Sequence, residues 1–208
     1  MQEIFYDWGG ANVWLFHALN NLHFALLDRL MQLGTVLGDH RNFTLYVSLV
    51  ALLAVMEVAT TPAQDALRYQ TQATRWVATV AVFSIAYLLD GWLISALKPL
   101  LDFPRPLLAL PAGTVFVVGQ PEYHHSLPSG HSAFAMLVVA SLWPVLNRDW
   151  RILGAFFVIW VGLSRISLGA HFPADVLAGF SLGLIVVLLV RAAVQALLRR
   201  FSRKSDSV

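Results

Sequence analysis

Three short stretches of the sequence combine basic residues, histidines and a carboxylate at the edges of long apolar runs. In chain order they read KPLLDFPRP, PSGH and SRISLGAHFPAD. The residues in them that could do chemistry are Lys98, Arg105, Ser129, Gly130, His131, Arg165, His171 and Asp175. Charges at membrane depth are costly and tend to mark a functional site. Their chemistry depends on whether the intervening elements bring the three stretches to one place.

The three cations, Lys98, Arg105 and Arg165, have no matching set of carboxylates in these stretches. If they converge, they repel one another unless an anion with several oxygens lies between them, and phosphate is the natural choice. Arginine offers a planar fork for two phosphate oxygens, and lysine supplies a point charge. Ser129 and Gly130 open a predicted helix, where free backbone N–H groups and the positive end of the dipole favour an anion. The pattern predicts a phosphate-binding cradle.

The two histidines indicate chemistry beyond binding. His171 and Asp175 are four residues apart, and a carboxylate on one ring nitrogen would fix the tautomer and leave the other nitrogen free to attack. His131 comes from a different predicted helix and could give a proton to the leaving oxygen. The candidate reaction is phosphoryl transfer through a phosphohistidine, which water then hydrolyses. Because the three cations can neutralise the phosphate charge, we expect no metal ion and no cofactor.

The composition indicates an integral membrane protein. Of the 208 residues, 58% are hydrophobic and 12% are charged, whereas about a quarter of residues are charged in soluble domains. The formal net charge is only +2, and there is no basic stripe with interleaved aromatic residues, which argues against a nucleic-acid partner. The absence of cysteine from the sequence excludes disulfides, thiol catalysis and cysteine-type zinc sites.

A helix that crosses the hydrocarbon layer needs about 20 mostly apolar residues. Five stretches qualify, roughly 43–60, 76–97, 132–147, 152–169 and 175–197. The first 42 residues interrupt helical spacing with polar residues, which favours an amphipathic interfacial helix, with a sixth crossing as the alternative. The expected fold is all-α, a polytopic transmembrane helical bundle. The chain is expected to form one domain over 1–208, with an N-terminal interfacial segment at 1–42, the bundle at 43–198 and a basic cytoplasmic tail at 199–208.

Basic residues set the expected orientation, because they concentrate on the cytoplasmic side of membrane proteins. Nine of them fall on one side of the five predicted spans: Arg68, Arg75, Arg148, Arg151, Arg191, Arg199, Arg200, Arg203 and Lys204. That side should be cytoplasmic, and it holds the C-terminus. By the parity of the crossings, all three motif stretches then emerge together on the opposite, extracytoplasmic face.

In order, spacing and residue types, the three stretches resemble the signature of the type 2 phosphatidic acid phosphatase superfamily. The resemblance runs from Lys98 to Asp175 and implies a helical bundle and metal-independent dephosphorylation. It implies that His171 is the nucleophile, Asp175 its orienting partner and His131 the general acid. The implied phosphoryl-binding residues are Lys98, Arg105, Ser129, Gly130 and Arg165. Because the motifs are embedded among predicted spans, the chain resembles the membrane branch rather than the soluble acid phosphatases and vanadium haloperoxidases of the superfamily.

The resemblance implies a lipid phosphate or diphosphate as substrate, held in the bilayer, and a bacterial inner-membrane location with the active site facing the periplasm. Undecaprenyl diphosphate is the first choice and phosphatidylglycerol phosphate the second. The alternatives are a lipid phosphotransferase that uses the same site and a lipid A 1-phosphatase, while a transporter fits poorly because the charges gather at one interface. The sequence does not indicate a protein partner. It leaves Asp90, Asp102, His124 and His125 without an assigned role, although a solvated loop is the more typical place for the two histidines.

Overall fold

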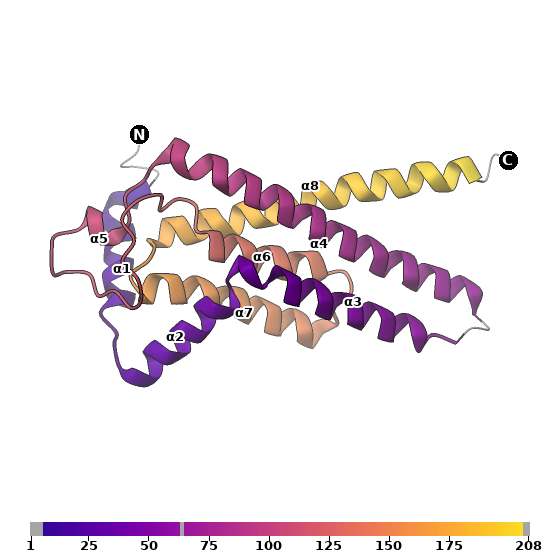
Figure 1. Cartoon of the computed structure of the whole chain (residues 1–208), viewed down its shortest axis with the longest axis horizontal. Helices are drawn as coiled ribbons and strands as arrows, with labels where there is room; N and C mark the ends of the chain where they lie inside the picture. Colours follow the sequence, from indigo (N-terminus) through magenta and orange to yellow (C-terminus); the bar gives the residue numbers. More distant parts are fainter. Residues whose placement is uncertain (1–5, 63–64, 206–208) are drawn as a thin grey trace.

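The computed structural model describes residues 6–62 and 65–205. This part of the chain is helical, without a β-strand, and its long helices run roughly along one axis (Figure 1). The elements are η2 Trp8–Gly10, α1 Ala11–Asn20, α2 Ala25–Leu37, η3 His40–Asn42, α3 Phe43–Ala59, α4 Ala66–Leu101, α5 Pro106–Ala109, α6 Gly130–Leu142, α7 Arg148–Ser167 and α8 Pro173–Ser205. The all-α prediction is confirmed.

Four helical segments of the described residues are long and apolar enough to span a membrane. They are His40–Ala59, Ala66–Ala109, Arg148–Ser167 and Pro173–Arg200. They agree with four of the five predicted spans, and the chain is an integral membrane protein.

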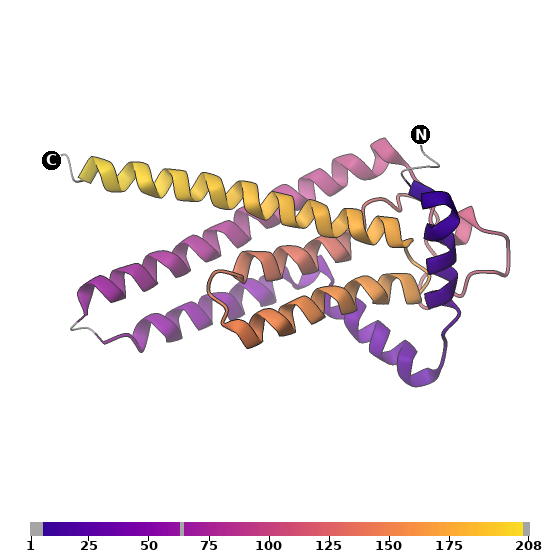
Figure 2. The same cartoon turned by 180° about the vertical axis from the view of Figure 1, so that it is seen from behind.

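The predicted span at 132–147 is instead the shorter helix α6, Gly130–Leu142. Its 13 residues cover about 20 Å, against about 30 Å for the hydrocarbon layer. Pro144 follows two residues after the helix end, and a proline disfavours helical backbone at the residue before it and cannot continue a helix. The turn between α6 and α7 therefore lies partway along α4 and α8 (Figure 2). The number of crossings stays a prediction.

Helix α4 begins ten residues before the predicted span at 76–97. Asp65 caps it, because its side chain accepts a hydrogen bond of 3.0 Å from the backbone N–H of Arg68. The added first turns, ALRYQTQATR, are polar, so a hydropathy criterion marks only the apolar part of a longer helix. Helix α8 likewise continues past residue 197 and through the predicted tail as far as Ser205, and 206–208 lie outside the described residues.

The predicted interfacial segment at 1–42 forms two helices rather than one, and residues 1–5 lie outside the described part. Helix α1 lies across the end of the bundle where α8 begins, and α2 packs on α7 (Figures 1 and 2). Helix α2 exposes Leu26, Leu30, Leu33 and Val36, as a helix at a lipid interface would. Its placement in the interface stays a prediction.

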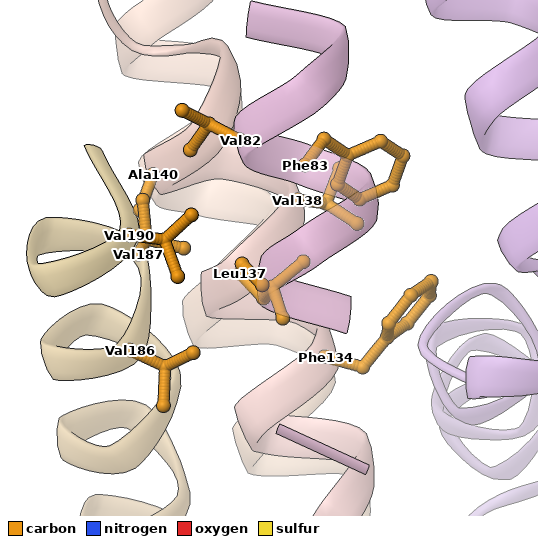
Figure 3. Packing of buried hydrophobic residues seen from close by; sticks show 10 residues of the cluster. Val82, Phe83, Phe134, Leu137, Val138, Ala140, Val186, Val187 and Val190 are labelled. Atoms are coloured by element: carbon orange, nitrogen blue, oxygen red, sulfur yellow. The ribbon is translucent and has the colours of Figure 1, made fainter. Parts of the chain in front are cut away.

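The main core lies between α4, α6 and α8 (Figure 3). Its buried members are Val82, Phe83, Ala86, Phe134, Leu137, Val138, Ala140, Val186, Val187 and Val190. Gly179 and Gly183 of α8, one turn apart, contact the backbone of α6 at Ser129 and Ala133. Small residues at this spacing let two helices approach closely where lipid provides no hydrophobic driving force. This close packing fixes the first turn of α6 against the first turns of α8.

Candidate active site

The C-terminal ends of α4 and α7 and the N-terminal ends of α6 and α8 lie at the same end of the bundle, beside α1 (Figures 1 and 2). The structure thus brings the three sequence motifs together, as the parity of the predicted crossings requires. Each motif sits where a helix meets a loop.

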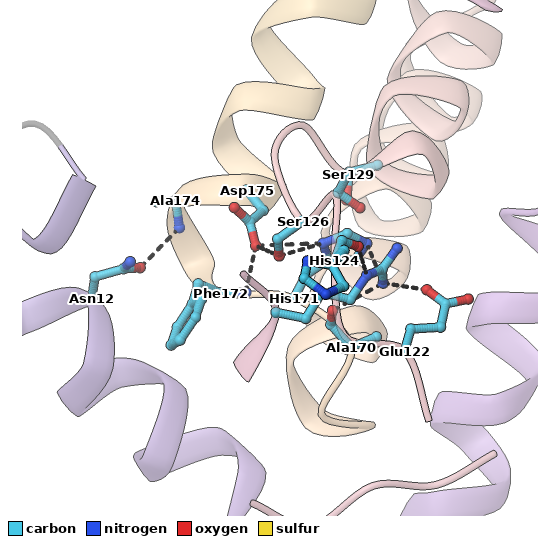
Figure 4. A network of polar contacts seen from close by, with 12 residues as sticks. Asn12, Glu122, His124, Ser126, Ser129, Ala170, His171, Phe172, Ala174 and Asp175 are labelled. Atoms are coloured by element: carbon cyan, nitrogen blue, oxygen red, sulfur yellow. Dashed lines mark hydrogen bonds and ion pairs between the residues drawn. The ribbon is translucent and has the colours of Figure 1, made fainter. Parts of the chain in front are cut away.

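A buried histidine–carboxylate pair forms the centre of the site (Figure 4). His171 closes the short turn between α7 and α8, and Asp175 lies in the first turn of α8. His171 Nδ1 is 3.4 Å from Asp175 Oδ2, and both residues are almost completely buried. The predicted pairing is therefore present in the geometry, with the carboxylate on Nδ1 and with Nε2 on the other side of the ring.

Three donors hold the Asp175 carboxylate. Ser126 Oγ donates to Oδ2 at 2.5 Å, and the backbone N–H of Phe172 donates to the same oxygen at 2.8 Å. Tyr6 OH donates to Oδ1 at 2.8 Å. Burial raises the pKa of Tyr6, with the nearby Asp175 charge as a second cause, so the phenol keeps its proton and stays a donor. The carboxylate is fixed before any substrate arrives.

Sequence reasoning missed both side-chain donors. Tyr6 lies 169 residues from Asp175 in the chain, and nothing in its local sequence marks it. Ser126 stands two residues before the PSGH motif. Its position beside a motif is the one sequence signal that could have marked it as a site residue. Asn12 connects α1 to the first turn of α8, because its Oδ1 accepts a 3.0 Å hydrogen bond from the backbone N–H of Ala174.

Arg105 contacts the second ring nitrogen of His171, Nε2. Its Nη1 lies 3.3 Å from Nε2, and because arginine can only donate, this contact assigns the ring proton to Nδ1. Nη1 also donates to the carbonyl of Ala170 at 3.1 Å, and Nε donates to the carbonyl of His124 at 3.0 Å. The guanidinium is thus anchored to two loops directly beside the nitrogen predicted to attack.

Glu122 neutralises this arginine, and sequence reasoning did not anticipate it. Its Oε2 lies 2.5 Å from Arg105 Nη1. The Glu122 side chain is 53% exposed, whereas that of Arg105 is only 7% exposed. A half-exposed carboxylate therefore pairs with a guanidinium that was predicted to bind phosphate.

A cavity of about 460 Å³ lies beside His171. Six of the eight predicted site residues line it: Lys98, Arg105, Gly130, His131, Arg165 and His171. The other two, Ser129 and Asp175, are fully buried behind it. Ser129 accepts a 3.0 Å hydrogen bond from Ser132 Oγ, and its backbone N–H donates to the carbonyl of Asp175 at 3.0 Å. In this arrangement Ser129 ties the PSGH motif to α8.

Four further polar residues at this end form two groups. Thr35 of α2, also missed from the sequence, accepts a 2.5 Å hydrogen bond from Arg165 Nη1 and so helps to hold that cation. Asp102 pairs with His125 at 3.2 Å and His124 at 3.8 Å, and all three side chains are about half exposed. The expected solvated loop therefore accounts for the two histidines. Among the described residues, no group of three or more histidine, aspartate and glutamate side chains could hold a metal ion.

Burial sets the protonation state of His171. It lowers the pKa of the imidazole from its ordinary value of 6.5 to about 3; the Asp175 hydrogen bond opposes this shift and the charge of Arg105 adds to it. His171 is therefore neutral at pH 7, and its Nε2 lone pair accepts the contact from Arg105. The geometry gives a neutral, oriented ring nitrogen beside a cavity lined by three cations and a second histidine.

The comparison with protein families agrees with this site. Residues 78–199 match the PAP2 superfamily, and the chain belongs to this family, which is the one that the three motifs resemble. The match covers more than half of the chain and includes all eight site residues.

Several curated proteins are similar to this chain. Phosphatidylglycerophosphatase B of Bacillus subtilis (strain 168) is 37% identical over 94 residues, which cover 40% of this chain and 45% of that protein. Lipid A 1-phosphatase of Rhizobium johnstonii is 30% identical over 52% of this chain and 44% of that protein. Undecaprenyl-diphosphatase of Sulfolobus acidocaldarius is 25% identical over 84% of this chain and 74% of that protein. The chain thus spans less than half the length of the first two relatives.

Two solved structures share the fold. The crystal structure of Aquifex aeolicus LpxE matches with a TM-score of 0.67 and 23% identity, over 86% of this chain and 94% of that one. A transmembrane PAP2-type phosphatidylglycerolphosphate phosphatase from Bacillus subtilis matches with a TM-score of 0.66 and 23% identity, over 92% and 88%. Both support a transmembrane helical bundle.

Proposed function

We propose that this protein is a membrane enzyme that removes phosphate from a lipid phosphate or diphosphate through a phosphohistidine on His171, without a metal ion. One observation carries the proposal: the buried His171–Asp175 pair presents a neutral ring nitrogen to a cavity lined by Lys98, Arg105 and Arg165. Membership of the PAP2 superfamily and the named phosphatases among its relatives support the same reaction.

In the first step, the substrate phosphate displaces Glu122 from Arg105, and Arg105 turns from His171 to the phosphate. The Nε2 lone pair then attacks phosphorus, a P–N bond forms, and the P–O bond to the lipid breaks with its electron pair on the leaving oxygen. Burial, and next the charge of Arg165, lower the pKa of His131 to about 2, so it must gain its proton from the substrate. The phosphate enters as a monoanion, offsets the cations and passes its proton to His131, which gives that proton to the leaving oxygen. The ring now carries a positive charge, which the fixed Asp175 carboxylate stabilises.

In the second step, water attacks phosphorus on the opposite side from His171. His131, now neutral, takes a proton from the water, the P–N bond breaks, and inorganic phosphate leaves. Throughout both steps the three cations stabilise the negative charge that develops on the phosphoryl oxygens. Preorganised donors of this kind are commonly worth a factor of about 10²–10³ each in rate.

The proposed location is the inner membrane of a bacterium, with the site on the periplasmic face and the C-terminus in the cytoplasm. The support is the distribution of charge. Arg68 and Arg75 lie in the first turns of α4, and Arg148 and Arg151 in the first turn of α7, at the ends of these helices that point away from the site, which agrees with the positive-inside rule.

The substrate is proposed to reach the site sideways from the bilayer. The cavity wall includes Leu88 and Trp92 of α4, which are 69% and 67% exposed, so the cavity borders a surface that would face lipid. The sequence ranks undecaprenyl diphosphate first and phosphatidylglycerol phosphate second, and relatives of this chain are named for both lipids and for lipid A.

Phosphate release by the detergent-purified protein in EDTA tests the function. The panel is undecaprenyl diphosphate, phosphatidylglycerol phosphate, phosphatidic acid and a lipid A 1-phosphate, with product lipids analysed in parallel. We expect release from at least one lipid, loss of release in His171→Gln, and normal release in His17→Gln, a matched change on α1. Equal release by His171→Gln, or dependence on added metal, would contradict the proposal. A newly phosphorylated acceptor lipid in place of free phosphate would identify a phosphotransferase.

A further inference from the structure

Asp90 is the one acidic residue within the apolar part of α4, two turns before Lys98. It lines the same cavity as His131, Arg165 and His171. Only 4% of the residue is exposed, and its Oδ1 is buried with no hydrogen-bond partner among the described residues. The proposed mechanism does not use it.

A buried acceptor without a partner is costly, and an intramembrane carboxyl is costlier still. Such a group is retained where something supplies the missing donor. The surrounding protein supplies none to Oδ1, and the open space beside Asp90 is the active-site cavity itself. The donor must therefore come from the contents of that cavity.

The position of Asp90 indicates which part of a substrate would meet it. Eight residues of helix separate the Cα atoms of Asp90 and Lys98, about 12 Å along α4. The side chains of both residues line one cavity, in which Asp90 lies on the side farther into the bundle. A phosphate held by Lys98, Arg105 and Arg165 has its lipid side directed toward this depth. The part of the substrate that passes Asp90 is the part between the reacting phosphate and the hydrocarbon chains.

We infer that Asp90 accepts a hydrogen bond from a hydroxyl of the substrate headgroup and so selects lipid phosphates whose headgroup carries one. Ionised phosphate oxygens only accept hydrogen bonds and cannot supply a donor to the unpartnered Oδ1 of Asp90, whereas a glycerol or sugar hydroxyl can. At least one oxygen of Asp90 accepts in either protonation state of the carboxyl. The inference rests on the proposed phosphatase function and deepens it.

The inference reverses the order of the candidate lipids. The headgroup glycerol of phosphatidylglycerol phosphate has a free hydroxyl next to the reacting phosphate, and the sugar of a lipid A 1-phosphate has donors in the same region. Undecaprenyl diphosphate offers a second phosphate and then hydrocarbon, and phosphatidic acid offers only ester oxygens. Neither supplies a donor to Asp90, so both should be poorer substrates.

The test compares phosphatidylglycerol phosphate with an analogue in which the free headgroup hydroxyl is replaced by hydrogen. Phosphate release gives kcat/KM for the wild type, Asp90→Leu and Asp90→Asn. Because the analogue leaves a buried acceptor unpaired, the wild type should prefer the hydroxyl lipid by roughly 10- to 100-fold. In Asp90→Leu, kcat/KM for the hydroxyl lipid should fall, so that the ratio of kcat/KM between the two lipids becomes about one. Asp90→Asn keeps an acceptor oxygen and should retain part of the preference.

Glu57→Leu is the matched control, since it removes a carboxylate near the far end of α3 and should leave the ratio at the wild-type value. A wild-type ratio near one, or a preference that persists in Asp90→Leu, would overturn the inference. Faster release from undecaprenyl diphosphate than from phosphatidylglycerol phosphate, still dependent on His171, would overturn it while leaving the proposed function intact. Absence of release from every lipid would overturn both.

Discussion

Replacing Glu122 with glutamine should make the protein bind phosphate more tightly. The Glu122 carboxylate lies 2.5 Å from Arg105 Nη1, and Arg105 in turn contacts Nε2 of His171. A substrate phosphate must displace the carboxylate to reach the guanidinium. Glu122 therefore competes with the substrate for the same cation, and the amide of Glu122→Gln competes less well.

The size of the effect follows from the exposure of the two partners. Arg105 is almost buried, but the Glu122 side chain is 53% exposed, so solvent screens much of the attraction. A pair of this kind contributes about 1 kcal/mol. Removing it should tighten phosphate binding about fivefold, because 1.4 kcal/mol corresponds to a factor of about ten. The difference should shrink at high salt, which screens a half-exposed pair.

The assay is competitive inhibition of lipid hydrolysis by inorganic phosphate, with Ki measured for the wild type, Glu122→Gln and Glu57→Gln at low and high salt. Glu57→Gln makes the same chemical change and the same change in net charge at the other end of the bundle, so it should keep the wild-type Ki. If Glu122→Gln leaves Ki unchanged or weakens phosphate binding, then Glu122 holds Arg105 in place for the substrate, and the idea of competition is refuted.

Three further predictions follow from the same geometry. Tyr6→Phe removes one donor to Asp175 and should lower kcat about fivefold with KM unchanged; a rise in KM alone would show that Tyr6 shapes the cavity and does not position the carboxylate. In the unfolded chain His171 is protonated below about pH 6.5, and in the folded chain only below about pH 3. This difference should lower the free energy of unfolding progressively as the pH falls from about 6.5 to about 3. In detergent, lowering the pH through this window should therefore lower the unfolding temperature of His171→Gln by less than that of the wild type. An equal decrease in the two proteins would contradict the pKa assigned to His171. Gly183→Ala should lower the unfolding temperature, because its Cβ would collide with the Ala133 carbonyl at a cost of about 1–3 kcal/mol, whereas Gly91→Ala, which meets open space, should not lower it.

The sequence was sufficient to predict that the three motifs meet. Each motif borders a long apolar run, and the parity of the runs places all of their ends at one side of a bundle. The pairing of His171 with Asp175 was also predictable, because a spacing of four residues at the start of a helix leaves few alternatives. These inferences depend on local pattern and on the order of elements along the chain.

The contacts that complete the site depend on tertiary structure and were not predictable in this way. Tyr6 reaches Asp175 only because α1 lies across the end of the bundle, and Thr35 reaches Arg165 only because α2 packs on α7. Glu122 stands in a loop with no helical or strand periodicity to fix its direction. The length of α6 was overestimated because apolar residues continue into a turn around Pro144, and hydropathy does not register where the backbone leaves the helix.

The central claim is that His171 forms a covalent bond to phosphorus, and trapping that intermediate tests it most directly. The purified protein would be mixed with lipid substrate, quenched in base, digested and analysed by mass spectrometry. The account predicts one phosphoryl group on the peptide that contains His171, stable in base, released in acid, and absent from His171→Gln. Phosphate on a different residue, or hydrolysis at the full wild-type rate by His171→Gln, would contradict the account.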